Sequence, residues 1–119
     1  MSFKTLLAYQ KGFSLAMDIF HLTKEFPKSE IYGLSSQIIR SSRSVCSNIS
    51  EGYRKRQYEK HFKSKLSDAD SENLETQLWL EFAKACEYIS EKEKIELQSK
   101  SEEVGKLLNY MINNPDKFK

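Results

Sequence analysis

The stretch Ile31–Gly52, IYGLSSQIIRSSRSVCSNISEG, decides the fold of this chain. At helical spacing one face of this stretch gathers the apolar residues, and that face comprises Leu34, Ile38, Ser41, Val45, Ile49 and Gly52. A nearly opposite face comprises Ser36, Arg40, Arg43, Ser47 and Arg54. Ile39, Cys46 and Tyr53 form a third line at seven-residue intervals. The stretch therefore predicts a helix with a core face, a second apolar seam and a basic ridge, which must satisfy more than one neighbour.

Composition favours one all-helical domain over residues 1–119. The chain has only four Gly and two Pro, which argues against a β-sandwich. Its 119 residues are long enough for a core without disulfides. The two cysteines, Cys46 and Cys86, lack the spacing of a metal site, and we expect free thiols in a reducing cytoplasm. No secretory leader and no membrane-spanning run is expected.

Apolar periodicity predicts four helices, at about 5–25, 30–51, 57–90 and 91–113. Ser29 is the expected N-cap of the second helix and Gly52 its C′ residue, while Ser90 and Glu93 form a capping box for the fourth. Short connections and the lack of strand-like alternation predict an antiparallel up-down-up-down four-helix bundle.

The same periodicity predicts which residues of the third and fourth helices face the core. In the third helix the expected core line runs through Phe62, Leu66, Ala69 and Asn73 and continues through Leu74, Leu78, Phe82, Ala85 and Ile89. The fourth helix places Leu97, Ser101, Val104, Leu108 and Met111 inward. The serines of the second helix favour close packing over a nucleophilic role.

The first helix is apolar on two sides, which indicates a neighbour beyond a lone bundle. One stripe comprises Leu6, Tyr9, Phe13, Met17 and Phe20, and the other Leu15, Ile19, Leu22 and Phe26. A monomer would expose one such stripe. We therefore predict an oligomer interface that comprises Leu15, Ile19, Leu22, Ile39, Cys46 and Tyr53.

Charge is distributed unevenly along the chain. Residues 40–65 hold eight Lys or Arg against Glu51 and Glu59, whereas residues 67–119 hold seven against twelve acidic residues. Basic residues interleaved with Tyr53, Tyr58 and Phe62 can neutralise phosphates and offer rings for stacking. The predicted nucleic-acid contacts are Arg40, Arg43, Arg54, Lys55, Arg56, Lys60, Lys63 and Lys65. A solvated turn, or a patch that meets the acidic half of a neighbouring subunit, remains an alternative reading.

No catalytic constellation emerges from the sequence. His21 and His61 stand alone, without the spacing of a metal site, and the carboxylates around Asp68–Glu75 are typical of a solvated helix face. Four scattered glycines cannot build a phosphate-binding loop. We expect no enzyme, no metal and no cofactor.

Two segments resemble the signature of a bacterial four-helix-bundle family encoded in intervening sequences of 23S rRNA genes and at unrelated loci. They are Tyr32-Gly33-Leu34 with Gln37-Ile38-Ile39-Arg40, and Ser44–Gly52. Leu74-Glu75-Thr76-Gln77-Leu78 and Tyr9-Gln10-Lys11 resemble other recurring segments of that family. The chain departs from the pattern at Cys46, where family members often have proline, and at Asn73, which replaces a common acidic residue.

The resemblance implies a ring-shaped homo-oligomer, typically a pentamer. The similar accessory protein of diversity-generating retroelements binds nucleic acid and a reverse transcriptase on a basic surface. Two hypotheses follow for this chain. It is a non-catalytic oligomer that binds structured RNA or RNA/DNA through its basic segment, or it is a structural adaptor ring that recruits a protein partner without binding nucleic acid.

Overall fold

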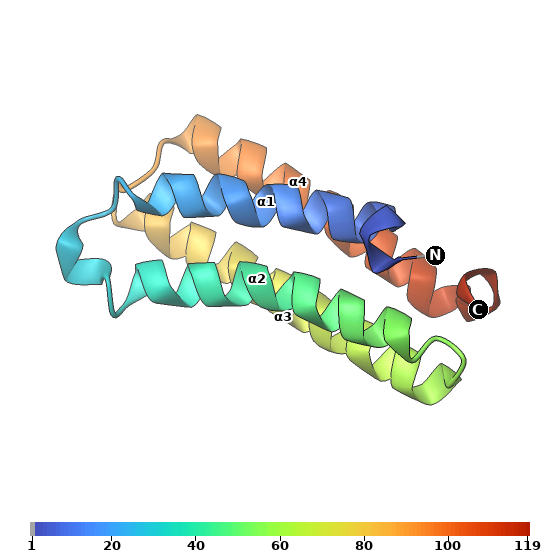
Figure 1. The fold of residues 1–119 in the computed structure, drawn as a ribbon. Coiled ribbons are helices and arrows are strands. Elements are labelled where there is room, and N and C mark those ends of the chain that lie inside the picture. The colour runs from blue at the N-terminus through green and yellow to red at the C-terminus, as the bar shows by residue number, and fades with distance from the viewer. Residues whose placement is uncertain (1) are drawn as a thin grey trace.

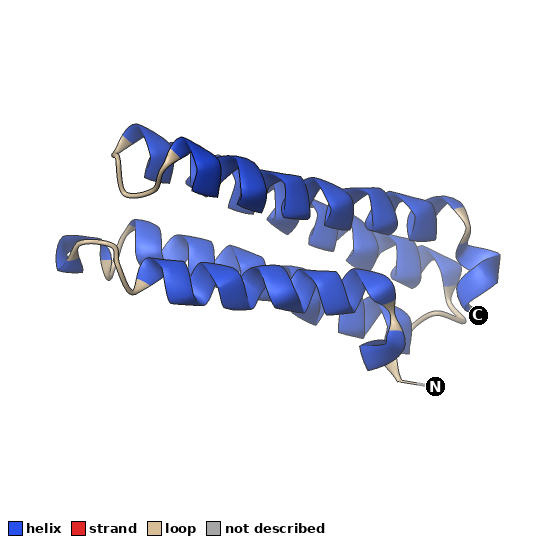
Figure 2. Cartoon of the chain, turned by 90° about the horizontal axis from the view of Figure 1, so that it is seen from above, coloured by secondary structure: helices blue, strands red, loops and turns tan. Residues whose placement is uncertain are grey.

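The computed structural model describes residues 2–119, which fold into four long helices without a strand. The helices are α1 (Leu7–Thr23), α2 (Leu34–Arg54), α3 (Glu59–Ala85) and α4 (Glu91–Asn113). Short 3-10 turns cover Phe3–Thr5, Lys28–Glu30 and Pro115–Phe118. Each helix packs on the next and α4 returns to α1, so both termini and the α2–α3 turn lie at one end (Figure 1). The predicted all-α up-down-up-down bundle is confirmed, and the view from above shows the loops confined to the two ends (Figure 2).

Helix α2 is the centre of the bundle, and its core face lies as the sequence predicts. Ile38 and Ile49 are fully buried, and the rest of that face is buried with them. Gly52 differs from the prediction because it lies inside the helix, which continues to Arg54. A Cβ added to Gly52 would lie 3.2 Å from the Lys65 Cβ, so this glycine serves the close approach of α3.

Side chains cap the N-termini of two helices, α2 and α4. The predicted capping box is confirmed, since the Glu93 N–H donates to Ser90 Oγ and the Ser90 N–H donates to Glu93 Oε1. The prediction of Ser29 as a cap is wrong, because Ser29 lies in the 3-10 turn before α2. The carboxylate of Glu30 instead accepts from the Leu34 N–H at 3.0 Å.

The face of α1 that the sequence assigns to the oligomer interface packs inside the protomer instead. Leu15 and Ile19 are buried in the protomer, and Tyr53 of α2 is buried as well, so their assignment to an oligomer interface is wrong. The reason is that Leu15 and Ile19 share a face with small residues, which lets α2 approach. A Cβ on Gly12 would lie 3.5 Å from Cys46 Sγ. The middle of the other stripe, Phe13 and Met17, is therefore left exposed, although Leu6 of the same stripe is buried.

The second half of α3 also differs from the prediction. Its core line continues from Asn73 through Thr76, Leu80 and Ala83, all buried. The predicted continuation through Leu74, Leu78 and Phe82 is wrong, because these residues are about half exposed and the helix keeps the same inward face throughout. Ile89, predicted at the end of that line, is buried but lies beyond the end of α3. In α4 the five predicted inward residues are all buried.

A belt of polar side chains divides the core into two apolar clusters. Ser41 of α2 bonds Thr76 of α3 through their hydroxyl oxygens, 2.8 Å apart. Asn73 donates from Nδ2 to the Ser101 carbonyl at 2.8 Å, and Ser101 Oγ donates to Asn73 Oδ1 at 2.9 Å. Gln77 Nε2 completes the set by donating to Ser101 Oγ at 2.9 Å. These bonds fix the relative register of three helices, because each buried polar group has its partner on a neighbouring helix.

Within residues 2–119, no helix has the length and apolar character needed to cross a membrane.

Candidate nucleic-acid interface

The α2–α3 turn is held by its own backbone and by one ring. The Lys55 and Arg56 N–H groups donate to the Gly52 and Tyr53 carbonyls, and the Tyr58 N–H donates to the Lys55 carbonyl at 2.8 Å. The Tyr53 ring is buried beneath the turn, and the Arg56 guanidinium lies over it, 4.3 Å from the ring centre. Arg56 Nη1 also donates to the Tyr53 carbonyl at 3.0 Å. The turn therefore presents its side chains from a fixed backbone.

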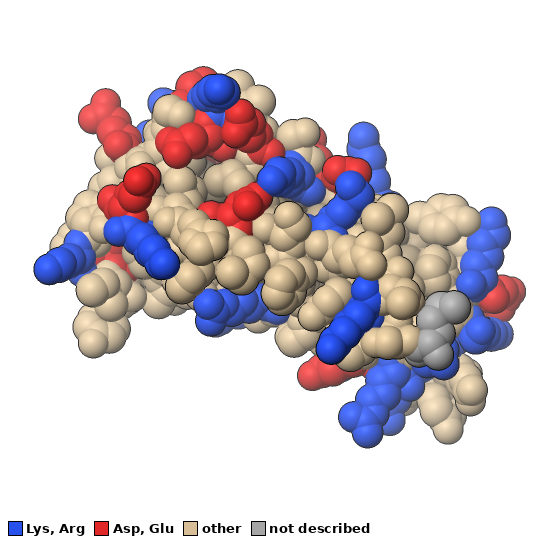
Figure 3. Space-filling view, turned by 45° about the horizontal axis from the view of Figure 1, so that its top comes forward, with Lys and Arg blue, Asp and Glu red and all other residues tan. Residues whose placement is uncertain are grey.

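Six basic side chains surround this turn, and we call them the turn cluster. They are Arg54, Lys55, Arg56, Lys60, Lys63 and Lys65. Within residues 2–119, Arg54, Lys55 and Lys60 are exposed and make no ion pair or side-chain hydrogen bond. In the space-filling view, basic side chains gather at the end that carries the turn and the termini, while acidic ones gather toward the opposite end (Figure 3). An anion approaching this end meets cations whose charges no carboxylate of the described chain neutralises.

The other two lysines of the turn cluster are paired within the chain. Lys65 Nζ lies 3.0 Å from a Glu51 carboxylate oxygen, and this hydrogen bond raises the pKa of Lys65. Lys63 lies 3.7 Å from Glu59, one helical turn earlier. Because these are exposed surface pairs, solvent screens them and they contribute little to stability, so a phosphate can compete for either lysine.

The C-terminal segment adds two lysines that the sequence analysis missed. The Phe118 ring packs against Phe62 at the start of α3, with ring centres 6.2 Å apart, which brings Pro115–Phe118 to the same end of the bundle. Lys117 lies over the Tyr110 ring, and Lys119 pairs with Asp116 at 2.9 Å. The predicted topology could have located these lysines, because in an up-down-up-down bundle the chain ends beside the second connection.

Arg40 lies apart from the turn cluster and is already paired. Its guanidinium contacts Glu75 at 2.6 Å and Glu72 at 3.0 Å, both on α3. The hydrogen bond to Glu75 is the largest cause that raises the Arg40 pKa. This arginine joins α2 to α3, and we do not include it among the proposed phosphate contacts.

Arg43 lies in an apolar groove that runs between the outer sides of α1 and α2. It is about 16 Å from Arg54 along the helix axis at 1.5 Å per residue. Its guanidinium lies 5.6 Å from the centre of the Phe20 ring, which also carries Lys24 Nζ at 4.8 Å. Arg43 therefore belongs to this α1–α2 groove and not to the turn cluster.

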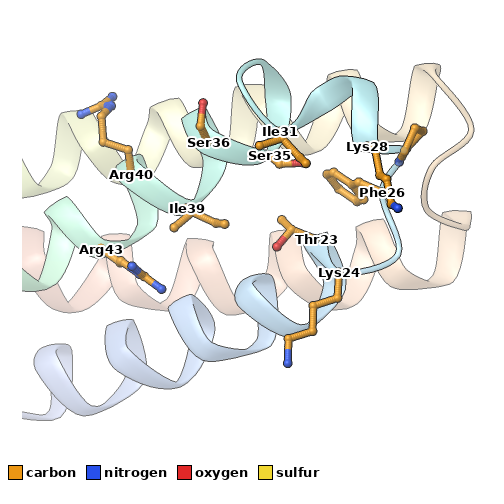
Figure 4. A pocket seen from close by; sticks show the side chains of 11 residues that line it. Thr23, Lys24, Phe26, Lys28, Ile31, Ser35, Ser36, Ile39, Arg40 and Arg43 are labelled. Carbon is orange, nitrogen blue, oxygen red and sulfur yellow. The ribbon is translucent and has the colours of Figure 1, made fainter.

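The α1–α2 groove consists of two hollows that share Arg43. One has a volume of about 620 Å³ and is lined by Thr23, Lys24, Phe26, Pro27, Lys28, Ile31, Ser35, Ser36, Ile39, Arg40 and Arg43 (Figure 4). The other has a volume of about 410 Å³ and is lined by Phe3, Tyr9, Phe13, Ala16, Met17, Arg43, Cys46, Ser47 and Ser50. Ile39 and Cys46, predicted at the oligomer interface, line the groove and are half-buried, as Leu22 of α1 also is.

The two surfaces differ in the groups that they expose. In the part of the chain that the structure describes, no group of three or more His, Cys, Asp and Glu side chains is placed to hold a metal ion. Burial raises the pKa of the Cys46 thiol to about 11, which keeps it protonated and a poor nucleophile near neutral pH. What these surfaces offer is unpaired positive charge at the turn and apolar area in the groove.

Comparisons with known proteins place the chain in a family. A family model described as 23S rRNA-intervening sequence protein matches residues 4–110. Among solved structures, the chain is similar to a protein of unknown function from the S23 ribosomal protein family of Bacteroides thetaiotaomicron VPI-5482, with 30% identity and a TM-score of 0.81. That match covers 90% of this chain and 96% of the other. The comparison with curated proteins finds no match. Since the family model spans most of its length, the chain belongs to the 23S rRNA-intervening sequence protein family.

Proposed function

We propose that this protein is a non-catalytic, cytoplasmic homo-oligomer that binds structured RNA or RNA/DNA through the turn cluster. The observation that carries the proposal is the set of unpaired cations on a fixed turn, Arg54, Lys55 and Lys60, beside Arg56 stacked on Tyr53. Phosphate binding to such a set releases counterions and tolerates changes of base sequence. Lys63, Lys65 and the C-terminal lysines extend the same surface. Arg43 serves the α1–α2 groove under this proposal.

The oligomer part of the proposal rests on apolar surface left outside the protomer. Phe13 and Met17 on α1 and Leu74, Leu78 and Phe82 on α3 are exposed, although all are large apolar side chains. A group of exposed large apolar side chains is typical of an interaction surface. The family resemblance supports a ring, and we propose a pentamer. Cys46 and Cys86 are both free, which fits a reducing compartment.

A salt titration of RNA binding tests the nucleic-acid part. Binding of a fluorescent RNA hairpin is measured by anisotropy for the wild type, for Arg54→Ala/Lys55→Ala, and for the control Lys92→Ala/Lys106→Ala. Both variants lose two exposed cations, but the control pair lies on α4 and is not part of the turn cluster. Each lost phosphate contact lowers the slope of log K against log salt by about 0.7–0.9, so the turn variant loses about 1.5 and the control keeps the wild-type slope. Equal slopes for the two variants would refute the assignment of the turn cluster.

A second function, an adaptor ring that recruits a protein, is favoured by the α1–α2 groove alone. The groove is apolar and basic and suits an acidic amphipathic helix. The same titration separates the two functions, because an adaptor that binds no nucleic acid would show no salt-dependent retention of the hairpin.

A further inference from the structure

The α1–α2 groove has a complementary surface on the other side of the same molecule. We propose that it receives the outer face of α3 from a second copy of this chain, so that copies assemble head to tail. We call that face the α3 ridge and define it by Leu74, Leu78 and Phe82. The inference rests on the proposed homo-oligomer and names the two surfaces that form it.

Shape is the first argument. Leu74, Leu78 and Phe82 are spaced four residues apart on one helix, and each is about half exposed. Trp79 contacts Phe82 with ring centres 5.8 Å apart and packs against the core on its other side, which holds the ridge in place. The groove is the matching concave surface, floored by Ile39, Cys46 and Ala16.

Charge is the second argument. The residues that line the groove include no carboxylate and four cations; Arg40 pairs with Glu72 and Glu75, whereas Lys24, Lys28 and Arg43 make no ion pair within residues 2–119. Between Lys65 and Lys84, by contrast, α3 carries five carboxylates and no cation of its own. Glu72 and Glu75 share the single Arg40 and Glu81 pairs with Lys94, whereas Asp68 and Asp70 make no ion pair within residues 2–119, so this part of α3 keeps an excess of negative charge. An apolar groove edged by positive charge thus faces an apolar ridge edged by negative charge. Complementary charges of this kind set the register and orientation of an interface.

Topology is the third argument. The groove lies on the outer side of α1 and α2, and the ridge lies on the outer side of α3, whose core residues Thr76 and Leu80 point the other way. Two different patches of one chain that pair with each other make a heterologous contact. Such contacts close into a ring when the rotation between copies allows it. A ring therefore needs no surface beyond these two.

Two single substitutions test the pairing. Met17→Glu places a carboxylate in the groove, where it meets the acidic ridge, and Leu78→Glu adds a carboxylate to the ridge itself. Like charges across an interface cost several kcal/mol, so each variant should raise the dissociation constant for self-association by about 100-fold or more. Analytical ultracentrifugation should then find each variant alone at the mass of one chain, 13.9 kDa, while the wild type sediments as an oligomer. Leu7→Glu is the matched control, because Leu7 is 52% exposed, as Leu78 is 49% exposed, but lies on neither surface.

Mixing the two variants gives the decisive result. Met17→Glu keeps an intact ridge and Leu78→Glu keeps an intact groove, so one native contact can form between them. We expect a 1:1 complex of twice the mass of one chain that grows no further, because its free surfaces are the two altered ones. A groove-to-groove contact would instead leave Leu78→Glu oligomeric, and a ridge-to-ridge contact would leave Met17→Glu oligomeric.

Several outcomes would overturn the pairing. These are a monomeric wild type, an oligomeric single variant, a mixture that stays monomeric, or dissociation by Leu7→Glu. Circular dichroism confirms that each variant is folded, and Phe13→Ser with Phe82→Ser repeats the mixing without adding charge. The turn cluster lies outside both surfaces, so the monomeric variants still bind the RNA hairpin if the proposed function holds. Loss of assembly and loss of RNA binding are thereby read separately.

Discussion

Replacement of Asn73 by alanine should remove the centre of the polar belt. Asn73 is almost fully buried and makes two hydrogen bonds with Ser101, one to the backbone carbonyl and one from the hydroxyl. Each bond contributes about 1 kcal/mol, and the cavity left by the amide adds about 1 kcal/mol more. The free energy of unfolding should therefore fall by about 3 kcal/mol, a large part of the 5–15 kcal/mol typical of a domain.

Ser101→Ala should cost less, about 1–2 kcal/mol, because it leaves Gln77 Nε2 and Asn73 Oδ1 short of one partner each without a large cavity. Since the two variants share a hydrogen bond, the double variant should be more stable than the sum of the single losses by about 1 kcal/mol. Urea unfolding followed by circular dichroism measures all four chains, at two protein concentrations so that assembly is recognised. Additive losses, or a loss below about 1 kcal/mol for Asn73→Ala, would refute the view that the belt stabilises the core.

Two further predictions concern titratable groups. With Ellman's reagent at pH 8 and no denaturant, the exposed Cys86 should react first, and the half-buried Cys46 should react much more slowly, because its pKa of about 11 leaves little thiolate at this pH. A Cys46→Ser variant assigns the fast phase, and two equally fast thiols would contradict the burial of Cys46. Partial burial raises the pKa of Asp70 in the folded chain above its pKa in the unfolded chain. The stability that the protonated carboxyl allows is therefore complete below the unfolded pKa, and it is lost as the pH rises through the folded pKa. Asp70→Asn should therefore gain stability over the wild type in urea unfolding at pH 7 but not at pH 3, and an equal effect at both values would count against desolvation as the cause.

Periodicity predicted the fold because all four helices are amphipathic, and two of them, α2 and α4, have a clear inward face. The core residues of α2 and α4 follow the 3.6-residue repeat closely, and the capping box of Ser90 and Glu93 marks where α4 begins. The end of α2 was harder to predict, since Gly52 suits both a C′ position and a close helix contact. Only the position of α3 shows that the second use applies.

The faces of α1 and α3 could not be assigned from hydrophobicity because each helix has two apolar stripes. Side-chain size gives a better signal in α1, where Ala8, Gly12 and Ala16 adjoin Leu15 and Ile19 and mark the side on which a neighbouring helix can approach.

In α3, the buried Asn73 and Thr76 hid the true core line, because polar residues in a core read as surface until their partners are known. Ser41 and Ser101, the partners of that line, lie 35 and 28 residues away in the sequence. The candidate site shows the same limit, since spacing placed Arg40 among free cations and only the structure brings Glu72 and Glu75 to it.

The uneven distribution of charge along the sequence can be interpreted from the packing of α2 against α3. Helices α2 and α3 are neighbours and carry opposite charge, so most of their charges could have paired within the chain. Arg40 does so, with Glu72 and Glu75. Arg43 instead faces outward over Phe20, and Asp68 and Asp70 of α3 make no ion pair in the part of the chain that the structure describes. Charges that stay unpaired within one chain can form ion pairs with opposite charges on another copy. The proposed contact between two different faces of the same protein would account for both the exposed aromatic rings and the unpaired charges.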